Sequence, residues 1–95
     1  MAQLSLLSGS EVQQALATHL RGCRKAAKLS REALAARSTV PAPTIKKFEL
    51  TGQISMRQFL LLWQCLDDLE RLQALTKPQR SSTSRPTTID EVIAE

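Results

Sequence analysis

Apolar residues recur at helical spacing along most of the chain, and no segment alternates between apolar and polar positions as a half-buried strand does. The first apolar stripe consists of Val12, Leu16, Leu20 and Cys23. Intervals of three and four residues place such side chains on one face of a helix. Ser10 and Gln13 form a capping-box pattern at its beginning. These features predict a first helix over residues 10–28.

Two shorter helices are predicted over residues 31–37 and 42–50. Ser30 precedes the first of them and can accept a hydrogen bond from an amide of the first turn. Pro43 is acceptable in the first turn of the second because the amides there have no helical partner. Gly52 is expected to end that helix in a left-handed conformation. The apolar residues expected to face inward are Leu34, Ile45 and Phe48.

A fourth helix is predicted over residues 56–66 behind Ser55, and a short fifth over residues 69–75. Together they carry more apolar surface than one small core easily buries. A chain of 95 residues is also only marginally stable alone. We therefore expect a homodimer, and the expected interface residues are Phe59, Leu62, Trp63, Leu66 and Leu69. The alternative is that these residues only complete the core of one chain.

The predicted fold class is all-α, with five short helices and a tail. Residues 10–76 form the expected domain, preceded by an N-terminal arm of residues 1–9. Residues 77–95 differ in composition, because residues 77–88 contain two prolines and no large apolar residue, which is typical of a flexible linker. The chain then ends in a short amphipathic segment, and the residues expected to dock on a partner are Ile89, Val92 and Ile93.

Charge is distributed unevenly along this sequence. The 13 basic and 9 acidic side chains give a net charge of +4, whereas residues 1–54 alone have a net charge of +5. A basic first half suits a polyanion such as DNA. An ordinary solvated helix surface would have the same charge, so charge leaves both interpretations open.

Several kinds of chemistry find no support in the residues. Cys23 and Cys65 fall among helical apolar positions, so we expect small buried thiols in a reducing cytosol. His19 is the sole histidine and has no neighbouring ligand set, so we expect a surface or core role and no metal site. We expect neither an enzyme nor a cofactor, because no nucleophile–base arrangement or phosphate-cradling glycine loop is visible.

The longest apolar run, residues 59–63, is far below the roughly 18 residues of a membrane span, and we expect a cytoplasmic protein.

Residues 29–49 carry the strongest functional signal. They predict two short helices joined by a tight turn, with small Ala35 where the helices cross and Val40 filling the angle between them. The residues expected on the outer face of the second helix are Ala42, Pro43, Lys46 and Lys47. A helix whose N-terminal end enters the major groove of DNA uses such positions on base edges.

The segment from about Leu16 to Leu75 resembles the XRE (Cro/C1-type) helix-turn-helix family of phage repressors and antitoxins. The matching residues are Arg24, Leu29, Ser30, Leu34, Ala35, Val40, Thr44, Ile45, Phe48, Glu49, Gly52, Ser55 and the Leu-rich fourth helix. The chain departs from the family pattern at Thr39, where the family usually has glycine. It also departs at Pro43, where many members carry a polar base-reading side chain.

This resemblance implies roles for particular positions. The residues that it implies contact DNA are Arg31, Ala42, Pro43, Thr44, Lys46, Lys47 and Arg57. The apolar ones would meet thymine methyl groups, the lysines would reach guanine edges or phosphates, and the threonine and arginines would contact phosphates. Arg24 and Glu49 match a family pair that ties the first helix to the end of the third.

We therefore predict a dimeric, sequence-specific DNA-binding repressor. A helical domain followed by a linker and an apolar-acidic end also resembles the HipB-like antitoxins, which repress their own operon and hold a HipA-type kinase toxin in a DNA-bound complex. Two alternatives remain open. One is a phage-type or stand-alone regulator of the same family without a toxin, and the other is a helical adaptor that binds only protein.

Overall fold

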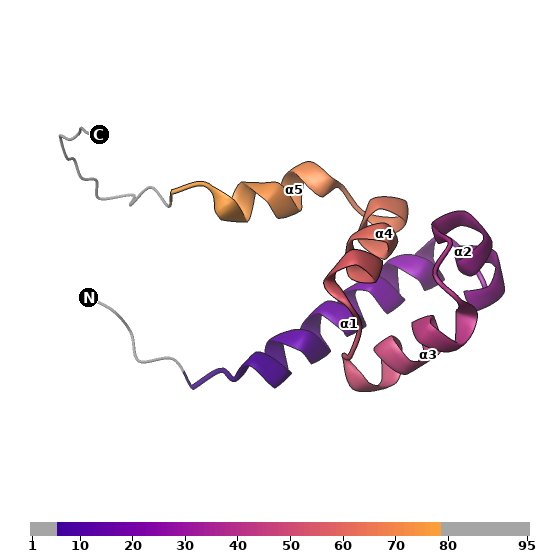
Figure 1. Cartoon of the computed structure of the whole chain (residues 1–95), viewed down its shortest axis with the longest axis horizontal. Coiled ribbons are helices and arrows are strands. Elements are labelled where there is room, and N and C mark those ends of the chain that lie inside the picture. The colour runs from indigo at the N-terminus through magenta and orange to yellow at the C-terminus, as the bar shows by residue number, and fades with distance from the viewer. Residues whose placement is uncertain (1–5, 79–95) are drawn as a thin grey trace, which may run out of the picture.

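The structure is a computed structural model that describes residues 6–78, and within this range it contains helices and no strands (Figure 1). The α-helices are α1 (Gly9–Ala26), α2 (Arg31–Ser38), α3 (Ala42–Thr51), α4 (Met56–Leu66) and α5 (Leu69–Gln73), and a 3₁₀ helix η1 (Ala74–Thr76) follows α5. The predicted all-α class with five helices is confirmed. The tail residues Ile89, Val92 and Ile93, which were predicted to dock on a partner, lie outside the described residues.

The first helix begins at Gly9, and its capping serine lies two residues earlier than the sequence pattern predicted. Ser8, rather than Ser10, precedes it: the Ser8 hydroxyl accepts a hydrogen bond from the Glu11 amide at 3.1 Å, and the Glu11 carboxylate accepts one from the Ser8 amide at 3.0 Å. The physical reason for the shift is charge. A carboxylate in the first turn interacts favourably with the positive end of the helix dipole, and the neutral Gln13 cannot do so.

A three-residue turn, residues 39–41, joins α2 to α3. Thr39 ends α2 in a left-handed conformation with φ 65°, at the position where the family that the chain resembles usually has glycine. This conformation is unfavourable for a β-branched residue. Hydrogen bonds hold the turn in place, because the Thr39 amide donates to the Ala35 carbonyl at 2.9 Å and the Val40 amide donates to the Ser38 hydroxyl at 3.1 Å.

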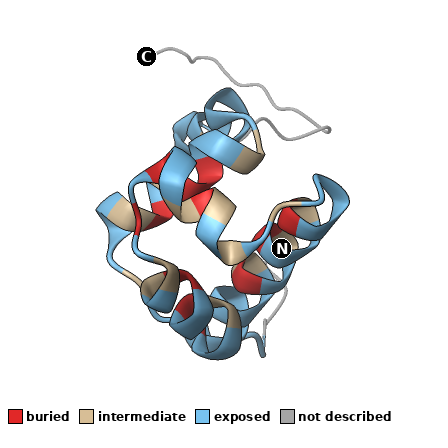
Figure 2. Ribbon diagram, turned by 90° about the vertical axis from the view of Figure 1, so that its right-hand side faces the viewer, coloured by how far each residue is buried: buried red, intermediate tan, exposed pale blue. Residues whose placement is uncertain are grey.

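The core lies between α1, α2, α3 and α4, where α1 and α2 both pack against α3 and α4. Figure 2 shows the buried residues on the sides of the helices that face one another, with exposed residues on the outer sides. The buried apolar residues are Ala17, Leu20, Leu34, Val40, Ile45, Phe48, Phe59, Leu62 and Trp63. The predicted inward positions of α2 and α3 are therefore confirmed.

The predicted dimer interface is wrong for three of its five residues. Phe59, Leu62 and Trp63 are 8%, 1% and 4% exposed in the single chain, because α4 turns them into its core. The ring of Phe59 packs against that of Phe48 at a centroid distance of 5.9 Å. Leu66 is half-buried and Leu69 is 39% exposed. The alternative interpretation, a face that completes the monomer core, holds for the inner side of α4.

The prediction that both cysteines are buried is wrong for Cys65. It is exposed, whereas Cys23 is half-buried, and both are free thiols. The reason is helical geometry, because the inner side of α4 is occupied by Leu62, Trp63 and Leu66. Cys65 therefore falls on the outer side of the same helix.

The fifth helix continues from α4 and projects beyond the body formed by α1–α4 (Figure 1). It contains no buried residue, and its half-buried Leu72 packs against the core. Asp68 caps it, since its carboxylate accepts a hydrogen bond from the Glu70 amide at 3.0 Å. Among residues 6–78, no helix is both long enough and apolar enough to cross a membrane.

Candidate functional site

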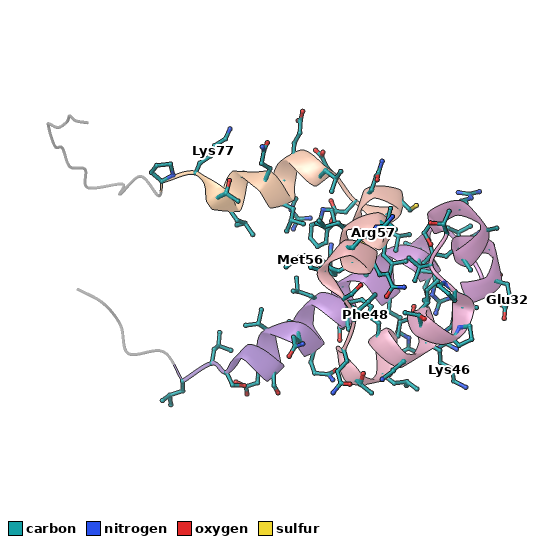
Figure 3. All side chains as sticks on the ribbon, viewed as in Figure 1. Glu32, Lys46, Phe48, Met56, Arg57 and Lys77 are labelled. Carbon is teal, nitrogen blue, oxygen red and sulfur yellow. The ribbon has the colours of Figure 1, made fainter. Side chains whose placement is uncertain are left out.

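The third helix has one buried side and one basic, exposed side. Ile45 and Phe48 are 1% and 2% exposed and seat α3 on the core, whereas Lys46 and Lys47 are exposed. In Figure 3 Lys46 extends away from the body at the end of α3 that follows the turn. Pro43 is also exposed in the first turn, as sequence reasoning expected for an outer-face residue.

A groove of about 500 Å³ runs between α3 and the beginning of α4. Its lining residues are Pro43, Thr44, Lys47, Gln53, Ile54, Ser55 and Gln58. Three of the seven predicted DNA-contacting residues therefore lie together along one groove. Ala42 is half-buried, and Arg57 is exposed in the first turn of α4. Lys46, Ala42 and Arg57 are not among the lining residues of the groove.

An ion-pair network fixes α3 to the two preceding helices. Arg24 on α1 forms a bidentate pair with Glu49 on α3, with Nε–Oε2 and Nη2–Oε1 distances of 2.7 and 3.0 Å. Arg24 also donates to the Leu29 carbonyl at 2.9 Å, just before α2. The predicted structural pair of Arg24 and Glu49 is confirmed.

Arg31 belongs to the same network, which sequence reasoning missed. Its Nε donates to Glu49 Oε1 at 2.9 Å, and its side chain is 30% exposed. The two residues are 18 positions apart in different helices, so no helical spacing relates them. The predicted phosphate contact of Arg31 stays a prediction, but its guanidinium is already held on one side by Glu49.

The carboxylate of Glu49 is charged at neutral pH despite its burial. Its side chain is 4% exposed. Burial by itself raises the pKa of Glu49, but the hydrogen bonds and positive charges of Arg24 and Arg31 outweigh this effect and hold the pKa below that of an ordinary glutamate. The network therefore orients α3 with charge-assisted bonds that do not switch near neutral pH.

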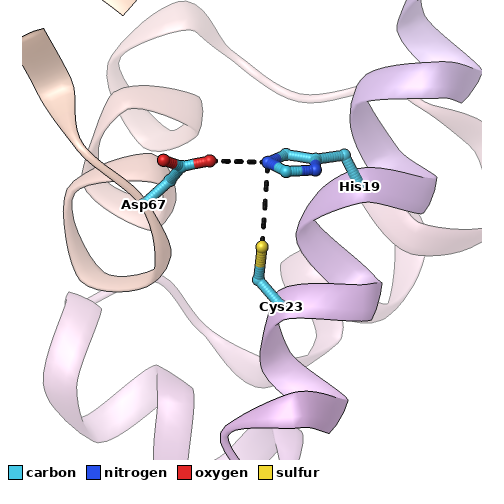
Figure 4. Close-up of side chains that lie close together, drawn as sticks. All are labelled: His19, Cys23 and Asp67. Atoms are coloured by element: carbon cyan, nitrogen blue, oxygen red, sulfur yellow. Dashed lines mark hydrogen bonds and ion pairs between the residues drawn. The ribbon is translucent and has the colours of Figure 1, made fainter. Parts of the chain in front are cut away.

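A second polar cluster joins α1 to the junction between α4 and α5 (Figure 4). The Nε2 atom of His19 lies 2.6 Å from Asp67 Oδ2 and 3.7 Å from Cys23 Sγ. Arg71 Nη1 binds the same Asp67 oxygen at 2.8 Å, and the Trp63 ring lies at a centroid distance of 5.3 Å from the imidazole. The expectation that no ligand set surrounds His19 is therefore wrong.

The sequence alone indicates only two of the three residues of this cluster. His19 and Cys23 are four residues apart, which places them on one face of α1. Asp67 is 48 residues from His19 and reaches it only through the fold. The hydrogen bond from His19, followed by those from the Asp68 amide and Arg71, keeps the pKa of Asp67 below that of an ordinary aspartate.

Comparisons with known proteins found no matching family model, no matching curated protein and no matching solved structure. Among residues 6–78, two candidate sites bring polar side chains together: the basic outer side of α3 with its adjoining groove, and the His19–Cys23–Asp67 cluster.

Proposed function

We propose that the protein is a sequence-specific DNA-binding transcriptional repressor in which α2 and α3 act as a Cro/C1-type helix-turn-helix. The observation that carries this proposal is the exposure of Lys46 and Lys47 on a helix whose opposite side is locked into the core. A rigid helix with a basic outer face suits the major groove of DNA. The position of the helix in the groove then determines which base edges its side chains can reach.

The proposed contacts are those that the family resemblance implies for these positions. Lys46 and Lys47 reach guanine edges or phosphates, and Ala42 and Pro43 contact thymine methyl groups. Thr44, next to Lys47 in the groove, and Arg57, at the beginning of α4, bind phosphates on the flanking strand. Arg31 adds a phosphate contact through the part of its guanidinium that does not face Glu49.

The outer face of α3 is short of the amide and guanidinium groups that read bases with two hydrogen bonds, so one copy of the chain gives modest specificity. A homodimer on a palindromic operator compensates by placing two such helices on one duplex. Because Phe59, Leu62 and Trp63 are buried and Leu66 packs against the core, the dimer face consists of Leu60 and Leu69, which are 38% and 39% exposed.

The antitoxin role is part of the same proposal. In it, the repressor controls its own operon and holds a HipA-like kinase through the C-terminal segment. The composition of residues 77–95, a proline-containing polar stretch followed by an apolar-acidic end, supports this role. Deleting residues 77–95 should leave DNA binding nearly intact and weaken binding of a HipA-type kinase. Equal kinase binding by the full and the shortened chain would mean that the C-terminal segment does not hold the kinase.

The DNA interface is tested by titrating the purified chain against the region upstream of its own gene and against a scrambled duplex, at two salt concentrations. The wild type is compared with Lys46→Ala/Lys47→Ala. The matched control is Lys77→Ala/Arg80→Ala, which removes the same charge beyond α5 along the chain. We expect the α3 variant to lose specific affinity by about 100-fold or more, since each base or phosphate contact contributes on the order of 1–3 kcal/mol.

Each outcome of this titration has a definite meaning. Specific binding that is lost in the α3 variant and kept in the control supports a repressor that reads with α3. Equal weak binding to both duplexes, falling steeply with salt in both variants, would mean that the basic face is only an electrostatic footprint. Absence of binding at low salt would favour the protein-only adaptor.

A further inference from the structure

Three side chains with metal-binding atoms converge where α1 faces the α4–α5 junction. Nε2 of His19, Sγ of Cys23 and a carboxylate oxygen of Asp67 all lie within 4.8 Å of one another. Imidazole, thiolate and carboxylate are the three ligand types that Zn²⁺ takes in proteins. The sequence pattern indicates only that His19 and Cys23 share a helix face, because the third ligand depends on a contact across 48 residues.

The distances suit a tetrahedral ion. Bonds of roughly 2.0–2.3 Å place neighbouring ligand atoms of Zn²⁺ roughly 3.5 Å apart. The Nε2–Sγ distance of 3.7 Å already matches this separation, and the Nε2–Oδ2 distance of 2.6 Å is shorter than it. Accepting an ion therefore requires the Asp67 carboxylate to move back by roughly 1 Å, within the reach of a side-chain rotation.

We propose that His19, Cys23 and Asp67 bind one Zn²⁺ ion that fastens the beginning of α5 to α1. The ion takes the place of the proton in the His19–Asp67 hydrogen bond, on the side facing Cys23 (Figure 4). Cys23 releases its thiol proton to solvent on binding, and the imidazole of His19 stays neutral by carrying its proton on Nδ1 instead of Nε2, so the two negative ligands balance the charge of the ion. A water molecule completes the tetrahedron, because three protein ligands leave one position open.

The groups around Asp67 include one that favours binding of such an ion and one that disfavours it. The Asp68 amide donates to Asp67 Oδ1 at 2.7 Å, which orients the carboxylate before metal arrives. Arg71 opposes the ion by its charge, since its guanidinium binds Oδ2. The Arg71 side chain is 63% exposed, however, so it can turn into solvent when the ion takes its place.

The location of the site explains what the ion would do. The His19 side chain is 36% exposed, so the site can load from solvent in the folded protein. The α5 helix has five residues, none of them buried, and is too short to be stable on its own. A bond from Asp67 through the ion to two residues of α1 fixes the point from which α5 starts. This role is independent of the proposed DNA interface.

The test uses Co²⁺ as a spectroscopic substitute for Zn²⁺ on the full chain with its thiols kept reduced. We expect a thiolate-to-cobalt charge-transfer band that saturates at one equivalent and disappears when Zn²⁺ is added. Cys23→Ser should remove the band, and His19→Gln and Asp67→Asn should each weaken Co²⁺ binding by about tenfold or more. Cys65→Ser is the matched control, because it removes the other, exposed thiol, and it should keep the band.

Thermal unfolding with and without Zn²⁺ gives a second readout. Zn²⁺ should raise the midpoint of the wild type and of Cys65→Ser but not that of Cys23→Ser, with circular dichroism checking that each variant is folded. A band that survives Cys23→Ser and vanishes in Cys65→Ser would assign the metal to the exposed thiol and overturn the proposal. Full Co²⁺ affinity in Asp67→Asn would overturn it as well, and so would the absence of a band in the wild type.

Discussion

Glu49 and Asp67 occupy similar positions in two different parts of the molecule. Each carboxylate lies between two side chains with N–H donors, and each ties α1 to a later part of the chain. The Glu49 side chain is 4% exposed, whereas that of Asp67 is 13% exposed and its partners reach solvent. The buried carboxylate, Glu49, holds the side chains of Arg24 and Arg31 in one arrangement. The more open one can exchange a partner without leaving a charge stranded in the core.

The largest effect is expected from Glu49→Gln. Arg24 is 7% exposed and would lose its counter-charge, so the variant should lose about 3–5 kcal/mol of unfolding free energy. Urea unfolding measures the loss. Glu32→Gln is the control, because Glu32 is an exposed acid on α2 and should change stability by less than about 0.5 kcal/mol. A loss in Glu49→Gln no larger than that of the control would show that the network is not needed to hold α3.

The C-terminal cap of α3, three residues after Glu49, offers the next effect, through backbone geometry instead of charge. Gly52 has φ 78°, and a Cβ there would lie 3.1 Å from the Gln13 backbone carbon and Cβ on α1. Gly52→Ala should therefore cost about 1–3 kcal/mol in urea unfolding. Gly22→Ala is the matched control, since its Cβ would meet nothing within 4 Å in the middle of α1, and it should stabilise by about 0.5–1 kcal/mol. A neutral Gly52→Ala would mean that α1 and α3 readily shift apart.

The sequence predicts the α3 side of the molecule better than the α5 side. The pair of Arg24 and Glu49 followed from resemblance to a family, and Ile45 and Phe48 followed from helical spacing. Trp63 was predicted to be buried, but the pattern did not say whether its own chain or a partner would cover it. An amphipathic stripe identifies which side of a helix leaves solvent, and only the fold decides what it packs against.

The His19 cluster was beyond prediction for a related reason. His19 and Cys23 share a helix face, which spacing can indicate, whereas Asp67 lies in the break between α4 and α5. Where such a break places a side chain depends on the packing of Trp63, whose indole N–H donates to the Asp68 carbonyl at 2.8 Å. One-dimensional periodicity contains no information on that contact.

Acid should weaken the Glu49 network in a defined direction. Because the folded-state pKa of Glu49 lies below its ordinary value of 4.5, its contribution to stability is complete above that value and is lost as the pH falls through the folded pKa. Wild-type stability should therefore fall as the pH is lowered below 4.5. Urea unfolding at a series of pH values measures this, and Glu49→Gln should show a shallower fall over the same range. Parallel curves for the two proteins would assign the acid sensitivity to other carboxylates.

The smallest change in global stability is expected from Asp67→Asn in metal-free protein, because the side chains around Asp67 can turn to water when it loses its charge. The effect should be local. Hydrogen exchange should quicken in α5 and stay unchanged in α2 and α3. Asp68→Asn is the matched control, because asparagine caps a helix as well as aspartate and should preserve α5. The contrary result would be that Asp67→Asn destabilises the whole domain as much as Glu49→Gln does. That result would mean that the difference in exposure does not distinguish the two carboxylates, and that the junction between α4 and α5 stabilises the fold as much as the attachment of α3.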